Sequence, residues 1–322
     1  MSPIRPISAE LAKVAKEQLH EDVSQLDSHL LVVKRWLKEL TSFEGTLEDQ
    51  NLISFLRGCK FSLEKTKDKL RLFFWIRTEL PEVIQNRDPL DDRVQEIIRL
   101  GVGTPLPITV NPTDPKIFII RVAQFDYTKF VFADVIKAAT LINDVLMRDD
   151  DQMVICGMAL IIDMADVTAG HLFQFEFSFL KQVAILYQDA SPLRMQGIHI
   201  LNPPPGVQSM VGLFNSLLSP KNKDRKIFVH GTSLESLHEY FHKSTLPLEY
   251  GGTLEPIQTY VDQWERRLKD NREYLLKMAE LRDRHSYENN LKPPQSPGAP
   301  LSPTSGKSHF GLDGSFRKLE LD

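Results

Sequence analysis

The sequence predicts an α/β protein, with an amino-terminal helical bundle followed by a mostly parallel β-sheet and flanking helices. Two patterns support this fold class. Through about residue 95, apolar residues recur at helical spacing behind capping residues such as Ser8 and Ser62. Beyond about residue 100, short apolar runs alternate with helical segments, which favours parallel strands joined by helical crossovers.

Helices are expected along the whole amino-terminal bundle. The first begins at Ser8 and ends near Leu19, and the next begins at Asp27 or Ser28. Another starts in the segment 47–52. The last runs from Ser62 to Leu80, where Pro81 ends it.

Strands and helices then alternate in the second half. The run Met153–Ile162 is short and rich in β-branched residues, which favours a buried strand over a helix. The other expected strands are Lys116–Val122, Ile198–Leu201 and Ile227–Val229. The expected helices are Phe132–Met147, Leu172–Tyr187, Val207–Leu218 and Leu234–Phe241.

The predicted elements and the composition divide the chain into segments. We expect a helical domain over residues 1–95, an α/β domain over 96–257, a charged helix over 258–285, and a linker and tail over 286–322. The tail begins with Pro293–Pro303, whose composition cannot bury enough apolar surface to fold, so it is expected to be a linker.

Composition limits the classes of function. The chain has 322 residues, of which 42% are hydrophobic and 25% charged, as in ordinary globular proteins. Its net charge of −4 gives no overall attraction to nucleic acid, so an anion-binding surface would have to be a local basic cluster. The cysteines Cys59 and Cys156 favour buried thiols in a reducing compartment. Without a signal peptide or a long apolar stretch, a cytoplasmic protein is expected. A monomer with no cofactor is expected as well.

Motifs for catalysis are weak. No Gly-x-Ser-x-Gly, phosphate-loop or His-Glu-x-x-His motif occurs, and Gly101–Pro105 lacks the third glycine of a dinucleotide loop. Asp163 and His171 would allow an acid–base pair. More simply, Asp163 caps the turn after a strand and His171 packs on the surface. His199 and His230 lack a third metal ligand, so buried imidazoles without a metal are expected, and the protein is predicted not to be an enzyme.

Two helical segments have more apolar surface than a helix lying on a sheet needs. In the first turns of Leu172–Tyr187, apolar residues cover most of the helix circumference. Such a helix either is wholly buried in the core or contacts apolar groups on two of its sides. The segment Val207–Leu218 presents the same two alternatives.

Between Asp163 and Gly252, short motifs follow one another in a distinctive order. They are Asp163-Met164, His171, Gln188–Arg194, Gly197–Pro203, Phe228–Gly231 and Leu246–Gly252. Together they resemble the CRAL-TRIO lipid-binding family, which includes retinaldehyde- and tocopherol-binding proteins. Phe55–Lys65 resembles the family's amino-terminal helical element, and Gly314–Leu319 resembles the tail of invertebrate tocopherol-transfer-like members. The resemblance implies a fold that encloses a lipid cavity, with Pro205–Leu218 as a movable lid.

The resemblance also implies a pocket with apolar walls and few polar groups. In it, Asn143 and Thr140 would hold a hydroxyl or carbonyl group of the cargo. The expected lining residues come from the helix after the first strand, from the central strand and the next helix, and from the gate: Ile136, Ala139, Thr140, Asn143, Met158, Leu160, Ile185, Leu186, Leu193, Val211 and Phe214.

One departure from the family pattern narrows the expected cargo. Members that load phosphatidylinositol tend to have an acidic residue directly after the proline of an Asp-x-x-Pro turn, where this chain has Leu193. The basic partner of that residue is present as Lys226. An uncharged isoprenoid, such as a retinoid, a tocopherol or a carotenoid, is therefore expected.

Contact with a phosphoinositide-containing membrane is the last implication of the resemblance. Basic residues near the lid would hold the headgroups: Arg194, Lys221, Arg225 and Lys226. Gln196 replaces a basic residue of relatives, and the run from 221 to 226 would also suit a solvated loop. Leu172, Phe173, Met210 and Leu213 stand where relatives insert apolar side chains into the bilayer. The alternatives to a carrier are a phosphoinositide-binding adaptor with a structural lipid and, less favoured, an enzyme acting on a retinoid or lipid ester.

Overall fold

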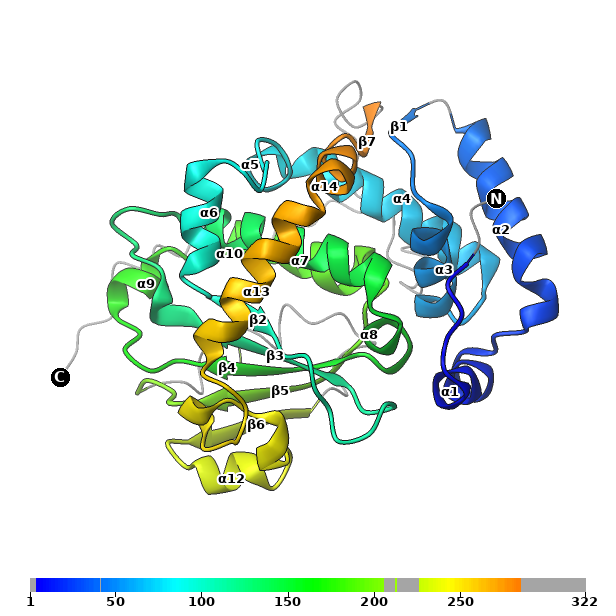
Figure 1. Ribbon diagram of the computed structural model, residues 1–322. Coiled ribbons are helices and arrows are strands. Elements are labelled where there is room, and N and C mark those ends of the chain that lie inside the picture. Colours follow the sequence, from blue (N-terminus) through cyan, green and yellow to red (C-terminus); the bar gives the residue numbers. More distant parts are fainter. Residues whose placement is uncertain (1–3, 41, 206–211, 213–225, 285–322) are drawn as a thin grey trace, which may run out of the picture.

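The protein is described here by a computed structural model that covers residues 4–40, 42–205, 212 and 226–284 (Figure 1). Its centre is a five-stranded sheet in the order β2-β3-β4-β5-β6. β2 pairs antiparallel with β3, and the other neighbours are parallel. The strands are β2 (Gly103–Pro105), β3 (Lys116–Arg121), β4 (Met158–Asp163), β5 (Met195–Leu201) and β6 (Lys226–Gly231). The predicted α/β fold class with a mostly parallel sheet is confirmed.

Helices fill the amino-terminal part, blue to cyan in Figure 1. Ser8 and Ser62 are the N-caps of the first and fourth helices, as expected, and Ser8 Oγ accepts a hydrogen bond from the Leu11 amide at 3.3 Å. The second helix begins at Leu26, just before the expected caps. The helices are α1 (Ala9–Leu19), α2 (Leu26–Glu39), α3 (Asp49–Gly58), α4 (Leu63–Glu79), α5 (Pro81–Ile84) and α6 (Asp92–Arg99).

Further helices alternate with the strands and follow them. They are α7 (Phe132–Asp149), α8 (Asp151–Cys156), α9 (Ala169–Phe173), α10 (Phe177–Ala184), the π-helical turn η3 (Ile185–Ala190), α12 (Leu234–His238), α13 (Ile257–Asp270) and α14 (Arg272–Ala279). The short strand β7 (Arg282–Asp283) then pairs antiparallel with β1 (Phe43–Glu44). This pairing brings the last described residues back to the amino-terminal helices.

The expected strand Met153–Ile162 is wrong in its first half, because Met153–Cys156 belong to α8. Asp150 Oδ1 accepts a hydrogen bond from the Met153 amide at 2.8 Å and so caps that helix. Gly157 then ends it with φ +84°, where a Cβ atom would lie 2.5 Å from the Arg194 carbonyl oxygen. β4 starts only at Met158.

The expected helix Leu172–Tyr187 is also divided, into α9, α10 and the π-helical turn η3. The charged helix expected over 258–285 is divided into α13 and α14, and it is wrong at its end, where Arg282–Asp283 form β7. The expected helix Val207–Leu218 lies almost wholly outside the described residues.

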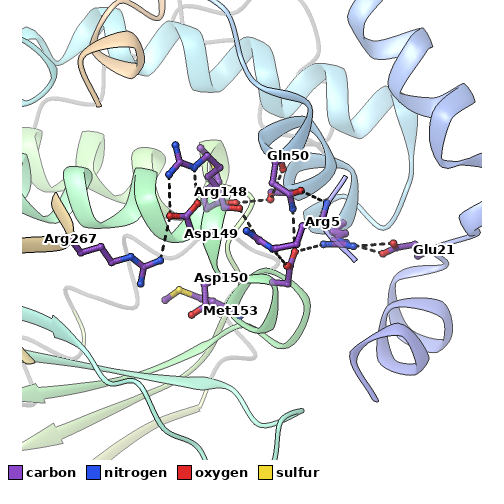
Figure 2. A network of polar contacts seen from close by, with 12 residues as sticks. Arg5, Glu21, Gln50, Arg148, Asp149, Asp150, Met153 and Arg267 are labelled. Carbon is purple, nitrogen blue, oxygen red and sulfur yellow. Dashed lines mark hydrogen bonds and ion pairs between the residues drawn. The ribbon is translucent and has the colours of Figure 1, made fainter. Parts of the chain in front are cut away.

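A balanced ionic network ties the amino-terminal helices to the body of the protein (Figure 2). Arg57 of α3 donates through Nε and Nη2 to Glu21 at 2.9 and 3.0 Å, and through Nη1 to Asp151 of α8 at 2.7 Å. Arg5 donates to the same Asp151 at 2.6 Å. Because Arg57 and Glu21 are buried, losing one partner would leave an uncompensated charge in the interior.

Candidate functional site

The two faces of the central sheet are covered to different degrees. Side chains alternate along each strand, and the register pairs Ile119 with Ile161 and Ile120 with Ile162. On the face toward α12 and the start of α13, Ile117, Ile119 and Ile161 are buried, and Ile161 is 0% exposed. On the opposite face, Phe118, Ile120 and Ile162 are only half-buried, and Val229 is 43% exposed.

That second, partly open face lies against α7 and η3. Ile136 of α7, Met158 and Leu160 of β4, Leu186 of η3 and Leu193 belong to one buried apolar cluster. The half-buried Ile185 packs against the same cluster. These predicted lining residues thus belong to the main hydrophobic core of the described chain. Val211 and Phe214, predicted from the lid, lie outside the described residues.

Thr140 and Asn143, the predicted polar groups of α7, have different surroundings. The buried Thr140 hydroxyl donates to the Lys137 carbonyl at 2.7 Å and accepts from Arg87 Nη1 at 3.4 Å. Its hydrogen-bonding capacity is therefore used by the protein. Asn143 is half-buried, as is Ala139 one helical turn earlier, and no described residue bonds its amide. Of the two predicted groups, Asn143 remains available to a ligand.

A buried ionic cluster fixes the orientation of α7 behind this site. Asp144 forms ion pairs with Arg77 of α4 at 3.0 Å and with Arg87 at 2.7 Å. Burial alone would raise the pKa of the Asp144 carboxyl, but the two guanidinium groups outweigh burial and lower it. Because Asp144 is held from one side, the neighbouring Asn143 is held in a defined position on the helix.

Tyr187 of the π-helical turn is a further residue of this region, which the sequence analysis did not select. Its hydroxyl donates to the Ile136 carbonyl over a long 3.5 Å. Burial raises the pKa of the phenol, although the side chain keeps part of its accessible surface. π-Helical turns occur often at functional sites.

Phe118, Ile120 and Ile162 were not selected either. The signal that finds them is the two-residue period of the strands, in phase with Leu160, since parallel pairing aligns Phe118 with Leu160. They extend the partly open face beyond the predicted lining residues.

The predicted phosphoinositide-binding residues are not assembled in the described part of the chain. Arg194 is half-buried, and its guanidinium donates to the Ile155 carbonyl. Burial lowers the pKa of Arg194. Lys221 and Arg225 lie outside the described residues, and Lys226 is the first residue of β6.

The predicted membrane-contact residues include one very exposed aromatic side chain. Phe173, at the end of α9, is 84% exposed, and Phe177 at the start of α10 is also exposed. The Lys181 ammonium lies 4.4 Å from the centre of the Phe177 ring. Leu172 is half-buried, whereas Met210 and Leu213 lie outside the described residues.

The residues weighed as catalytic groups have other partners. Asp163 accepts hydrogen bonds from the Ala165 amide at 3.0 Å and from the Tyr250 hydroxyl at 3.0 Å. His171 bonds the Phe125 carbonyl at 3.1 Å and is buried, so its expected place on the surface is wrong. Neither residue bonds the other. Throughout the described ranges, no group of three metal-ligating side chains is found, and no helix is long and apolar enough to cross a bilayer.

Both cysteines, Cys59 and Cys156, are buried and are not joined in a disulfide. Burial raises the pKa of the Cys156 thiol. The expected buried thiols are confirmed.

Comparison with known proteins identifies relatives over most of the chain. Residues 110–252 match the family model described as CRAL/TRIO domain, and residues 22–94 match a Pinta-like UBA domain. The human alpha-tocopherol transfer protein-like protein is 26% identical over 254 residues, covering 79% of this chain and 73% of the relative. Clavesin-1 of Xenopus laevis is 28% identical over 255 residues, covering 78% and 73%. A crystal structure of Sfh5 aligns with a TM-score of 0.47 at 13% identity, over 80% of this chain and 92% of that one, a likeness too weak to support an inference.

Proposed function

We propose that this chain, in which residues 110–252 match the CRAL/TRIO domain, is a lipid carrier. In this proposal it encloses one small hydrophobic molecule of the retinoid, tocopherol or carotenoid class. It exchanges that molecule at membranes that contain phosphoinositides. It performs no covalent chemistry on its cargo.

The observation that carries the proposal is the partly open apolar face of the sheet. Phe118, Ile120 and Ile162 lie on inner strands, where side chains of a filled core are normally buried, yet they keep accessible surface. A lipid that buried about 400 Å² of apolar area would gain up to roughly 10 kcal/mol. Association and ordering costs would remove a good part of that gain. Tight binding is therefore expected without an ion pair to the cargo.

The polar groups of this region favour an uncharged cargo with one hydroxyl or carbonyl group. The Asn143 amide has no bonded partner among the described residues, and the Tyr187 hydroxyl is held only by a long bond. The charged groups behind α7, Asp144 and Arg77, are already paired with each other. A charged headgroup would find no free counter-ion in that cluster, whereas a hydroxyl would find the Asn143 amide.

Exchange at a membrane is proposed from the exposed aromatic side chains and the basic residues. Phe173 and Phe177 would enter the bilayer surface while Lys181 stays at the headgroup level. The basic residues of the proposed phosphoinositide site are Arg194, Lys221, Arg225 and Lys226. For the carrier to load and release its cargo, membrane contact has to favour an open state of the protein, and bound cargo has to favour a closed state.

Transfer between vesicles tests the proposal. Donor vesicles carry a fluorescent tocopherol, and acceptor vesicles are prepared with and without phosphatidylinositol bisphosphate. We expect the protein to accelerate transfer, and Ile162→Trp, which fills the open face, to reduce it at least tenfold. Leu248→Trp is the control, because it places the same bulk at an exposed position elsewhere. Full transfer by the Ile162→Trp variant would contradict the proposal.

The alternatives give other outcomes. Vesicle binding without transfer, lost in Lys221→Ala/Arg225→Ala, would indicate an adaptor. Mass spectrometry of an organic extract of the folded protein identifies the bound molecule. A chemically altered molecule after incubation would indicate an enzyme.

A further inference from the structure

The face of the sheet toward α12 contains a separate hollow of about 300 Å³. Its origin lies in the sequence of two strands. Ala159 of β4 and Gly197 of β5 are partners in the register, so neither supplies a side chain longer than a methyl group at this place. Ile117, the β3 partner of Ala159, borders the hollow on the next strand. The sheet therefore has a recess at Ala159 and Gly197, whereas the next residues on the same face of these strands have large side chains.

Aromatic rings form one wall of the recess. The His199 ring lies nearly parallel to the Phe228 ring, with centres 4.7 Å apart and planes 17° apart. Tyr240 lies 4.4 Å from Phe228, and Phe241 lies 4.6 Å from His199. Tyr240 is 49% exposed, which is high for an aromatic residue beside a cavity. The wall presents ring surfaces against which a flat molecule would pack.

A chain of hydrogen bonds connects this wall to α12. His199 Nδ1 lies 3.0 Å from His230 Nε2, and His230 Nδ1 lies 2.8 Å from Ser236 Oγ. One proton lies between the two imidazoles, so the tautomer of His199 follows that of His230. No other described residue bonds His199 Nε2. This nitrogen can accept or donate one hydrogen bond, depending on the direction of these hydrogen bonds.

The recess is nearly free of charge. Burial lowers the pKa of His199 to about 4, so this imidazole is neutral near pH 7. No Lys or Arg occurs among the described lining residues. The carboxylate of Asp114 at the rim already accepts hydrogen bonds from the Asn111 amide and side chain. An anionic ligand would lose hydration here without gaining a counter-ion, and a cation would meet only the Asp114 carboxylate, which already bonds Asn111.

We propose that this recess is a second ligand site, which takes a flat, uncharged aromatic molecule of one or two rings with a hydroxyl or amine group that meets His199. Its size is at the small end of ligand pockets, which span roughly 300–1,000 Å³. The site is distinct from the lipid region, because Ala159 and Met158 are neighbours in β4 and face opposite sides of the sheet. It does not depend on the carrier function.

Binding of 2-naphthol to the full chain tests this site, with its saturated counterpart decahydro-2-naphthol as the comparison. Calorimetry should show that the wild type binds the aromatic probe at least tenfold more tightly than the saturated one. Ala159→Leu fills the recess and should weaken naphthol binding at least tenfold. Tyr240→Ala removes a half-exposed part of the wall and should weaken it about threefold to tenfold. Ala139→Leu, the same change on α7 across the sheet, should leave it unchanged.

These variants also locate the probe. Ala159→Leu adds apolar atoms to an empty space, so its melting temperature should not fall, and a folded variant without naphthol binding supports the site. No binding to the wild type, undiminished binding to Ala159→Leu, or loss of binding in Ala139→Leu would each overturn the proposal.

Discussion

Ile161 and Ile162 are neighbours in β4, but they lie on opposite faces of the sheet and are buried to different degrees. Ile161 has no exposed surface beneath α12 and the start of α13, whereas Ile162 keeps part of its surface on the side of α7 and η3. Both faces are made by apolar residues of the same strands. The difference shows that the sheet is tightly covered at Ile161, whereas the apolar side chains at Ile162 and its neighbours keep accessible surface.

The largest expected effect separates these two isoleucines. Ile161→Ala should lower the free energy of unfolding by about 3 kcal/mol, because it opens a cavity in a filled core. Ile162→Ala should lower it by only about 1 kcal/mol without cargo, because less buried surface is lost. Urea denaturation of the delipidated protein measures both. Equal losses would show that the two faces do not differ as described.

The face toward α12 should also respond to acid. His199 has a pKa of about 4 against an ordinary 6.5, so between these values the unfolded chain takes up a proton that the folded protein does not. Stability should therefore fall as the pH drops from about 6.5 toward 4, by an amount on the order of 2 kcal/mol. His199→Gln, which keeps a polar partner for His230, should reduce this fall. An unchanged pH dependence in that variant would assign it to other groups.

On the open face, two single substitutions in α7 should separate the effect on cargo binding from the effect on stability. Asn143→Leu removes the amide available to cargo and should weaken binding of the lipid found in the organic extract about threefold to tenfold, with little effect on folding. Thr140→Val removes the hydroxyl bonded to Arg87 and should lower stability by about 1–2 kcal/mol with little effect on cargo. Fluorescence titration and thermal denaturation give the two readouts. The reverse pattern would place Thr140, rather than Asn143, at the cargo.

The smallest effect is expected outside both faces. Phe173→Ser should reduce binding to vesicles a few-fold and leave the melting temperature unchanged, because Phe173 is largely exposed. Phe175→Ser is the matched control, since the Phe175 ring packs 4.7 Å from the Phe132 ring and its loss should destabilise the fold. Vesicle sedimentation detects the first change. Unreduced binding would remove Phe173 from the membrane-contact surface.

The sequence was sufficient for the order of the four parallel strands and the main helices, because the two-residue and 3.6-residue periods follow directly from strand and helix geometry. It was insufficient at Met153–Cys156, where a continuous apolar run has neither period. There the cap supplied by Asp150 and the stop at Gly157 decide the structure. Both residues were visible in the sequence, but their backbone conformation was not.

The candidate site shows a second limit. Helical spacing placed Thr140 and Asn143 near the same side of α7, but it could not show that Arg87, far away in the sequence, takes up the Thr140 hydroxyl. In the same way, the alternation in β4 shows which residues share a face. It does not show which face is left partly uncovered, because this depends on how helices distant in the sequence pack on the sheet.

The ionic network around Arg57 limits how the two matched segments of this chain can recombine with other domains. Arg57 lies in the segment that matches one family model, and its partner Asp151 lies in the segment that matches another. Phe55 and Met158 likewise share one apolar cluster. If recombination joined this helical segment to an unrelated α/β domain, the buried Arg57 guanidinium would lose the Asp151 carboxylate, unless the new domain had an acidic residue at the same position. We therefore expect the two matched segments to be retained together in evolution.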